Sequence, residues 1–168
     1  ESSFACLKKA QTGLLEIHDT FAGATCRTYL GLNHEAAGNY DQADELYMEA
    51  YEIMNEIGAP GYAMDSLAGS ARCALEMGSL ELAVEQVNQV CAYLESNGSK
   101  AMEFPILAYL TCARVFEGAG DQERRHKVIE EGYQQLMERA EKISNPDWRK
   151  VFLSKIGEIK EMYHILNH

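Results

Sequence analysis

Two arginines at related positions are the residues in this chain best suited to bind a ligand. Arg72 and Arg114 lie forty-two positions apart, and each falls near the end of a stretch with helical periodicity. A guanidinium group binds a carboxylate or a phosphate through two parallel hydrogen bonds, so two of them along one groove could hold an anionic ligand. In the alternative, each arginine pairs with a neighbouring acid, such as Glu76 or Glu117, and serves only the fold.

The first of these hypotheses makes a simple prediction. If both arginines bind a ligand, replacing Arg72 and Arg114 by alanine weakens the binding of an acidic peptide and leaves the melting temperature almost unchanged.

No catalytic motif occurs in the sequence. It lacks the Gly-rich phosphate-binding loop, the nucleophile elbow and the paired-histidine zinc motif. His164 and His168 are four residues apart and could share a helix face, but no third metal ligand accompanies them. Adjacent acids such as Glu130 and Glu131 point apart on a helix. We therefore expect no enzymatic activity, no metal and no cofactor.

The charge of the chain is acidic and unevenly distributed. The formal net charge of the 168 residues is −11, of which residues 1–100 contribute −10 and residues 101–168 only −1. Between Arg27 and Arg72 there are eight acidic residues and no Lys or Arg. This stretch is either a solvated surface or a surface for a basic protein partner. Direct binding of nucleic acid is not expected, because neutralising phosphates requires a basic patch.

Helical periodicity covers almost the whole chain and is interrupted by glycine-containing turns. We predict a single domain over residues 1–168, with an all-α fold of about eight helices. Its parts are the second helix of a truncated hairpin over 1–18, three helix hairpins over 20–57, 62–96 and 100–143, and one capping helix over 146–166. In the capping helix, Trp148, Phe152 and Ile156 are expected to pack in the core, because a terminal helix must close the array.

The best-defined stretch of this pattern runs from Leu30 to Ala50. Gly31 would let a facing helix approach closely, and Gly38 would end the first helix in a left-handed conformation. The second helix then carries small, large and small side chains on one face, at Ala43, Tyr47 and Ala50. Glycines at positions 78 and 120 repeat the corner at intervals of forty and forty-two residues.

These features resemble the tetratricopeptide repeat, a helix–turn–helix unit of about 34 residues. The resemblance implies a right-handed superhelix of antiparallel helix hairpins, an α-solenoid that binds a protein or peptide partner. Such arrays generally use the concave groove lined by the first helix of each hairpin. Counted from the corner glycines, the groove candidates are Thr25, Thr28, Leu32, Glu35, Asp65, Ala68, Arg72, Leu107, Leu110, Arg114 and Glu117.

A narrower resemblance lies at the end of the chain. The run Arg149-x-x-Phe152-Leu153 is similar to the closing segment of tetratricopeptide regions in large bacterial signalling ATPases, transcriptional regulators and nucleotide cyclases. Lys155-Ile156-Gly157 stands where those proteins usually continue with a proline. This resemblance implies an alternative function as the ligand-sensing regulatory domain of a multidomain protein.

The remaining predictions concern the setting of the protein. The five cysteines form no CxxC pair and lie beside apolar residues, which favours reduced, buried thiols and a cytoplasmic location. The longest apolar run, over residues 104–113, is too short to cross a membrane. The first residue is Glu1, so we expect a piece of a larger protein whose exposed repeat ends could form a homodimer.

Overall fold

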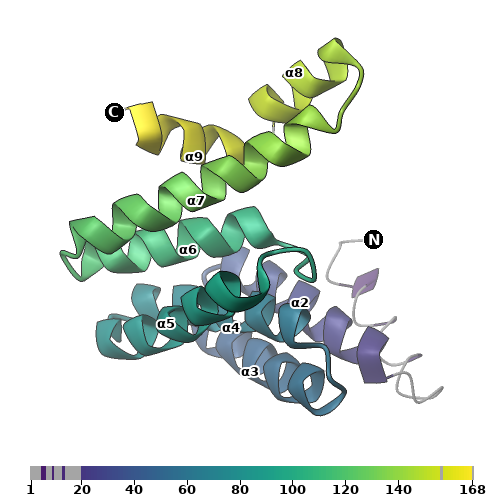
Figure 1. The fold of residues 1–168 in the computed structure, drawn as a ribbon. Helices are drawn as coiled ribbons and strands as arrows, with labels where there is room; N and C mark the ends of the chain where they lie inside the picture. Colours follow the sequence, from purple (N-terminus) through teal and green to yellow (C-terminus); the bar gives the residue numbers. More distant parts are fainter. Residues whose placement is uncertain (1–4, 7–8, 10–12, 14–19, 156, 168) are drawn as a thin grey trace.

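The computed structural model describes residues 5–6, 9, 13, 20–155 and 157–167, and in these ranges every regular element is an α-helix. This confirms the predicted all-α fold (Figure 1). The predicted helix over 1–18 lies almost entirely outside the described residues. The helices are α2 (Thr20–Ala36), α3 (Tyr40–Glu56), α4 (Pro60–Glu76), α5 (Leu80–Asn97), α6 (Pro105–Gly118), α7 (Gln122–Glu141), α8 (Pro146–Lys155) and α9 (Gly157–Asn167).

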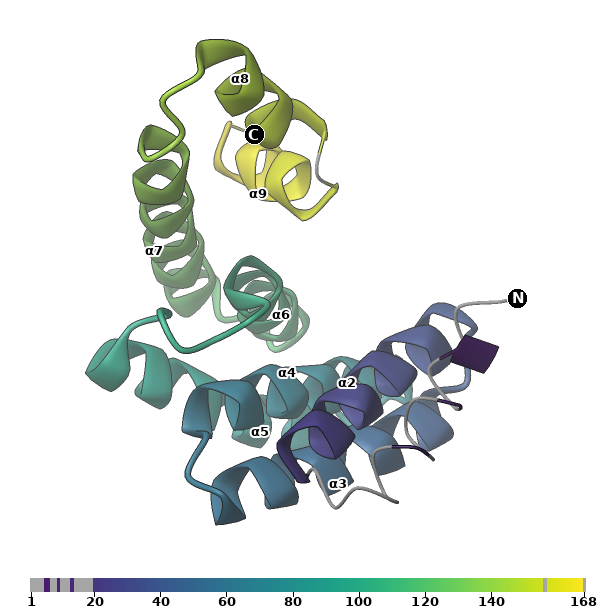
Figure 2. The ribbon, with the colours of Figure 1, turned by 90° about the vertical axis from the view of Figure 1, so that its right-hand side faces the viewer.

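Consecutive helices pack against one another as hairpins: α2 with α3, α4 with α5, and α6 with α7. The corner glycines have the conformation that the pattern predicts, with φ of 77° at Gly38 and 78° at Gly78, a region that other residues rarely adopt. Hairpins stack because α4 also packs on α3 and on α6. At the C-terminal end, α8 and α9 fold back so that α9 lies against α7 and α6 (Figure 2).

Tyr47 is the clearest example of how the sequence determines this stacking. Its side chain on α3 is completely buried, between Gly31 of α2 and Gly69 of α4. A Cβ atom at Gly31 would lie 2.8 Å from the tyrosine ring, and one at Gly69 would lie 2.5 Å from it. Two glycines on neighbouring helices therefore make the space that one large aromatic side chain fills.

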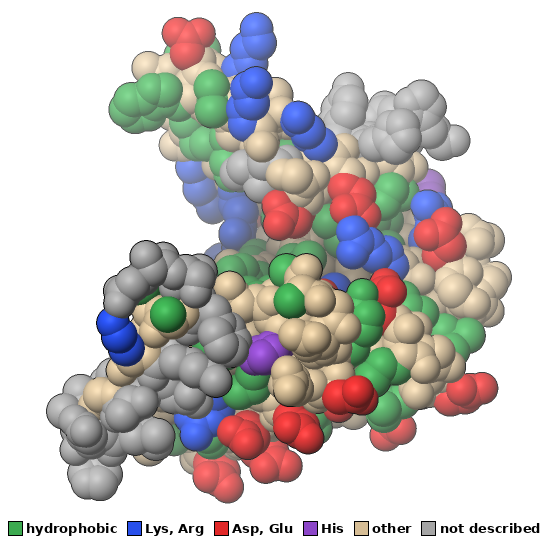
Figure 3. All heavy atoms as spheres, turned by 180° about the vertical axis from the view of Figure 1, so that it is seen from behind, with side chains coloured by type: hydrophobic (Ala, Val, Ile, Leu, Met, Phe, Trp, Pro, Cys, Tyr) green, Lys and Arg blue, Asp and Glu red, His purple; other side chains and the backbone are tan. Residues whose placement is uncertain are grey.

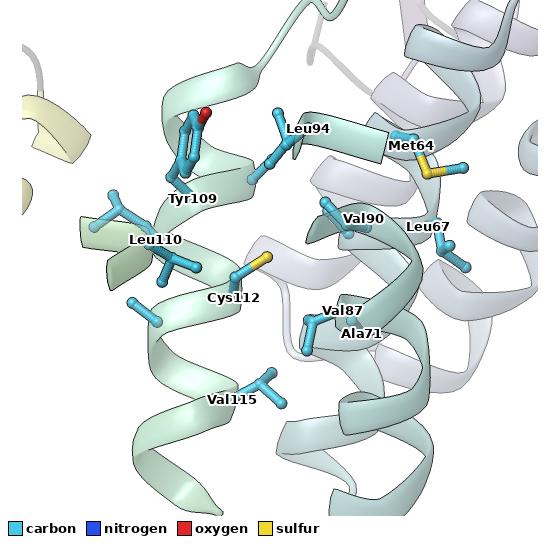
Figure 4. Packing of buried hydrophobic residues seen from close by; sticks show 14 of the residues in the cluster. Met64, Leu67, Ala71, Val87, Val90, Leu94, Tyr109, Leu110, Cys112 and Val115 are labelled. Carbon is cyan, nitrogen blue, oxygen red and sulfur yellow. The ribbon is translucent and has the colours of Figure 1, made fainter. Parts of the chain in front are cut away.

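The main hydrophobic core lies between α4, α5 and α6 (Figure 4). Val87 and Val90 of α5 and Cys112 and Val115 of α6 are all completely buried there. Both Val87 and Val90 occupy the positions that correspond to Tyr47 and Ala50 in the preceding hairpin. Smaller aliphatic side chains thus replace the tyrosine in the second repeat, where no equivalent pair of glycines makes room for a ring.

The third hairpin begins later than predicted. We expected its first helix from Lys100, whereas α6 begins at Pro105. Proline disfavours a helical conformation in the residue before it and is well suited to the first helical position. The Asp65 carboxylate of α4 also accepts hydrogen bonds from the backbone N–H groups of Glu103 and Phe104, at 2.7 and 3.1 Å, which holds the connection in place.

The predicted single capping helix is wrong. The segment forms two helices, α8 and α9, and the second begins at Gly157, where the low helix propensity of glycine favours a break. Phe152 packs against the core as expected, and Ile156 lies outside the described residues. Trp148 is 71% exposed, which contradicts its predicted core position. Phe152, one turn further along α8, and its neighbour Leu153 are the residues of this helix that pack against the core.

None of the described helices is both long and apolar enough to cross a bilayer.

Candidate functional site

The concave side of the array contains a cavity of about 290 Å³ between the C-terminal halves of α2 and α4 and the middle of α6. Seen from behind, the molecule is hollowed between the part that carries α7–α9 and the part that carries α2–α5 (Figure 3). The walls combine apolar and charged side chains. They are formed by Leu32, Glu35, Ala36, Tyr40, Arg72, Leu75, Glu76, Leu107 and Arg114. Both arginines singled out from the sequence therefore line the same groove.

Arg72 is committed to an internal ion pair. Its residue is only 7% exposed, and its guanidinium donates to both oxygens of Glu35, at 2.6 and 2.9 Å. It also donates to the hydroxyls of Thr111, at 3.0 Å, and of Tyr47, at 3.3 Å. Burial alone would lower the pKa of Arg72, but the hydrogen bonds and charge of Glu35 raise it above its ordinary value. Arg72 thus keeps its positive charge within the fold.

This arrangement overturns one sequence-based expectation. Removing Arg72 would leave the partly buried Glu35 carboxylate without its ion-pair partner, with only the hydrogen bond that the Tyr47 hydroxyl donates to it at 2.6 Å. Replacing Arg72 by alanine is therefore a change to the core, and the melting temperature should fall. The predicted neighbour Glu76 is not the partner of this arginine in the structure; Glu35 of the preceding hairpin is.

Arg114 has a different environment although it occupies the equivalent position. Its side chain is 43% exposed and forms a two-pronged ion pair with Glu161 of α9, with the closest atoms 2.6 Å apart. The predicted partner Glu117 instead lies 3.5 Å from Arg125 of α7. An exposed pair of this kind contributes little to stability.

The other groove candidates divide into buried and accessible residues. Thr28 is buried and bonded to the Ser66 hydroxyl, and Ala68 is buried beside it. Leu110 is completely buried in the core (Figure 4), so it has no surface with which to contact a partner. Thr25 is half-buried and donates to the Phe21 carbonyl oxygen. The accessible candidates on the cavity wall are Leu32, Glu35, Leu107 and Arg114.

Asp65 is also a structural residue. Both of its oxygens accept backbone N–H groups at the start of the third hairpin, and the residue is only 6% exposed. Burial raises the pKa of Asp65 to about 7, and the two N–H donors from Glu103 and Phe104 only partly offset this effect. Its position in the groove therefore reflects contact between hairpins.

Residues that sequence reasoning missed include Tyr40, Leu75 and Glu161. Tyr40 and Leu75 line the cavity, and their positions near the hairpin corners could have indicated this. Glu161 could not have been found in that way, because it lies forty-seven residues after Arg114 and on a helix whose boundary was not predicted.

Stacked helix hairpins with glycine corners, and a groove along their first helices, define a helical repeat scaffold. A model of the tetratricopeptide repeat family matches residues 4–96, which is more than half of the 168 residues. The chain belongs to the tetratricopeptide repeat family. Repeats of this family generally mediate interactions between proteins. No curated protein matches the chain.

The extent of the family match divides the molecule. It covers α2–α5 and ends before the third hairpin, so α6–α9 lie outside it. The narrower resemblance of the run from Arg149 to Leu153 to bacterial signalling proteins stays a prediction. In the structure Arg149 donates to the backbone carbonyl oxygens of Ile143 and Glu141 and so closes the end of α7.

Proposed function

We propose that this chain is a non-enzymatic scaffold that binds an extended segment of a protein partner in its concave groove, with Arg114 contacting a carboxylate of that segment. The observation that carries the proposal is the cavity of about 290 Å³, which has apolar walls and one exposed guanidinium. Leu32, Leu75 and Leu107 offer contact area to an apolar side chain. Arg114 supplies a bidentate donor for the carboxylate.

The ion pair with Glu161 gives the proposal a distinctive consequence. Glu161 is on α9 and occupies the position that a ligand carboxylate would take. Arg114→Gln should therefore weaken the binding of an acidic peptide, whereas Glu161→Gln should strengthen it by freeing the guanidinium. A purely structural role of the pair predicts that both changes act in the same direction.

The experiment is a selection of peptides from a random library against the whole chain, followed by calorimetry with the selected sequences. We expect peptides with an apolar residue next to Asp or Glu, bound about tenfold more weakly by Arg114→Gln. Arg124→Gln is the matched control, because Arg124 is exposed and paired with Asp121 outside the groove. Equal affinity for wild type, Arg114→Gln and the control would refute the role of the groove.

A second surface is proposed for a basic partner. Helix α3 carries six acidic residues and no basic one, and Asp41, Glu45 and Glu52 among them are exposed. Acidic side chains gather along the lower edge of the molecule in Figure 3. A uniformly charged face steers a partner of opposite charge and makes association depend on salt. If Glu45→Gln with Glu52→Gln leaves the affinity for a Lys-rich peptide unchanged at low salt, this face is only solvated.

The cellular setting is proposed on chemical grounds. The described cysteines are free thiols, and two of them, Cys73 and Cys112, are buried. Free thiols of this kind persist in a reducing compartment, which supports the predicted cytoplasmic location. Neither the homodimer through repeat ends nor the absence of nucleic-acid binding has been tested, and both stay predictions.

A further inference from the structure

A second cavity of about 320 Å³ lies at the C-terminal end of the groove, outside the region that the family match covers. It is open to solvent and is lined by the start of α6, the end of α7, and both α8 and α9. The segment before α6, over residues 103–104, and the first turn of α9 both contribute to its walls. Its walls are mainly apolar and include Ile106, Ile143, Phe152 and Ile159.

Arg139 on the cavity wall is unusual among the arginines. The other six, Arg27, Arg72, Arg114, Arg124, Arg125 and Arg149, each form an ion pair or a hydrogen bond. Within the part of the chain that the structure describes, Arg139 has neither. A guanidinium that is partly buried against apolar walls, with its five donors uncommitted, is suited to bind a carboxylate from outside the chain.

The same cavity also contains an uncommitted negative charge. Glu158, in the first turn of α9, lines the wall, and it has no ion-pair partner among the described residues, Arg139 included. The third charged residue of the wall, Glu103, already accepts a hydrogen bond from the Tyr29 hydroxyl. A ligand with a carboxylate alone would meet Arg139 but would also be repelled by the two glutamates. A ligand with both charges avoids this conflict.

We propose that this cavity binds a free, large apolar α-amino acid. Its carboxylate pairs with Arg139, its ammonium group with Glu158, and its side chain contacts Ile106, Ile143 and Phe152. The volume falls within the range of small-molecule sites, which combine apolar walls with a few polar groups that fix orientation. The proposal is independent of peptide binding at Arg114, since the two cavities share only Leu107.

The test is calorimetry of the whole chain with L-leucine and L-phenylalanine as probes. Two analogues remove one charge each: leucinamide lacks the carboxylate, and N-acetyl-leucine lacks the ammonium group. Wild type should bind leucine at least about tenfold more tightly than either analogue, because each lost contact is a charge-assisted hydrogen bond. Glycine, which has both charges and no side chain, should not bind measurably.

Variants assign each charge to its partner. Arg139→Gln should bind leucine no more tightly than leucinamide, because the contact to the carboxylate is lost and the two glutamates repel that carboxylate, while still distinguishing leucine from N-acetyl-leucine. Glu158→Gln should show the reverse pattern. Arg125→Gln is the control, since it removes a charge from the same helix at a distance from the cavity. Thermal unfolding of each variant checks that it is folded, which is expected because neither side chain forms an ion pair with another described residue.

Several outcomes would overturn the proposal. The cavity is not an amino-acid site if neither probe binds at millimolar concentration, or if glycine binds as well as leucine. The assignment of partners is wrong if Arg139→Gln retains the preference for leucine over leucinamide. Loss of binding in Arg114→Gln would place the amino acid in the other cavity.

Discussion

The hairpins of α2–α5 and the C-terminal part of α6–α9 are both built from antiparallel helices that pack in sequence, but they differ in what they leave exposed. In the first region, small residues let helices approach until Tyr47 is completely enclosed. In the second, α8 leaves Trp148 and Val151 exposed, and a cavity opens between the helices. Tight packing is not confined to the first region, since a Cβ atom at Gly132 of α7 would lie 2.6 Å from Met162. The difference lies at the C-terminal end, where the cavity lined by Arg139 and Glu158 opens.

The two arginines at equivalent positions give the largest expected contrast. Arg72→Ala removes one partner of a buried pair, which costs about 3–5 kcal/mol of unfolding free energy. Arg114→Ala removes an exposed pair and should cost no more than about 1 kcal/mol. Denaturant unfolding of the two variants measures both values. Similar losses would show that the two regions do not differ in this respect.

The next effect tests the close approach of helices. Gly69→Ala would place a Cβ atom 2.5 Å from the ring of Tyr47, which cannot move because it is fully enclosed. Overpacking of this kind costs about 1–3 kcal/mol or more. Gly157→Ala is the matched change in the C-terminal part. A Cβ atom there would have no described atom within 4 Å beyond its chain neighbours and its own helix backbone, so the change should have little effect or stabilise slightly. A well-tolerated Gly69→Ala would contradict the account of tight packing.

Asp65 links the two regions and should make the stability of the fold depend on pH. Its pKa of about 7 in the folded protein lies above the ordinary value of 3.8, so the folded state binds the proton more tightly. The resulting stabilisation is fully present below pH 3.8 and is lost as the pH rises through 7. Between these values, the unfolding free energy of wild type should fall relative to that of Asp65→Asn. Parallel pH profiles for the two proteins would contradict this expectation.

The smallest effect concerns the exposed tryptophan. Trp148→Ser should change the unfolding free energy by no more than about 0.5 kcal/mol, as expected for a surface position. Trp148 is the single tryptophan of the sequence, so its fluorescence reports on this site alone. The emission should resemble that of indole in water and be quenched readily by acrylamide. A blue-shifted, protected emission would mean that α8 is covered.

The fold could be predicted to the level of helix hairpins because its signals are local. Ala43, Tyr47 and Ala50 share one helix face by spacing alone, and all three are completely buried. The C-terminal boundary was harder to predict. An apolar stripe on the last segment predicts an amphipathic helix, but not that Gly157 divides it or that Trp148 faces solvent.

The candidate site was predictable in position more than in role. Equal spacing from the corner glycines placed Arg72 and Arg114 in one groove, and both line the same cavity. The spacing does not reveal which acidic residue pairs with each arginine. Glu35 and Glu161 come from other helices at distances of thirty-seven and forty-seven residues, and these contacts decide which arginine is buried.

The ion pair of Arg72 has a consequence for how the array unfolds. Arg72 of α4 donates hydrogen bonds to Glu35 of α2, Tyr47 of α3 and Thr111 of α6. In a simple linear array each repeat touches only its neighbours, so the ends can fray while the middle persists. Here the unfolding of any one of these four helices breaks hydrogen bonds of the same Arg72 cluster. The repeats it joins are thereby coupled into one cooperative unit, which loses its structure in a single transition.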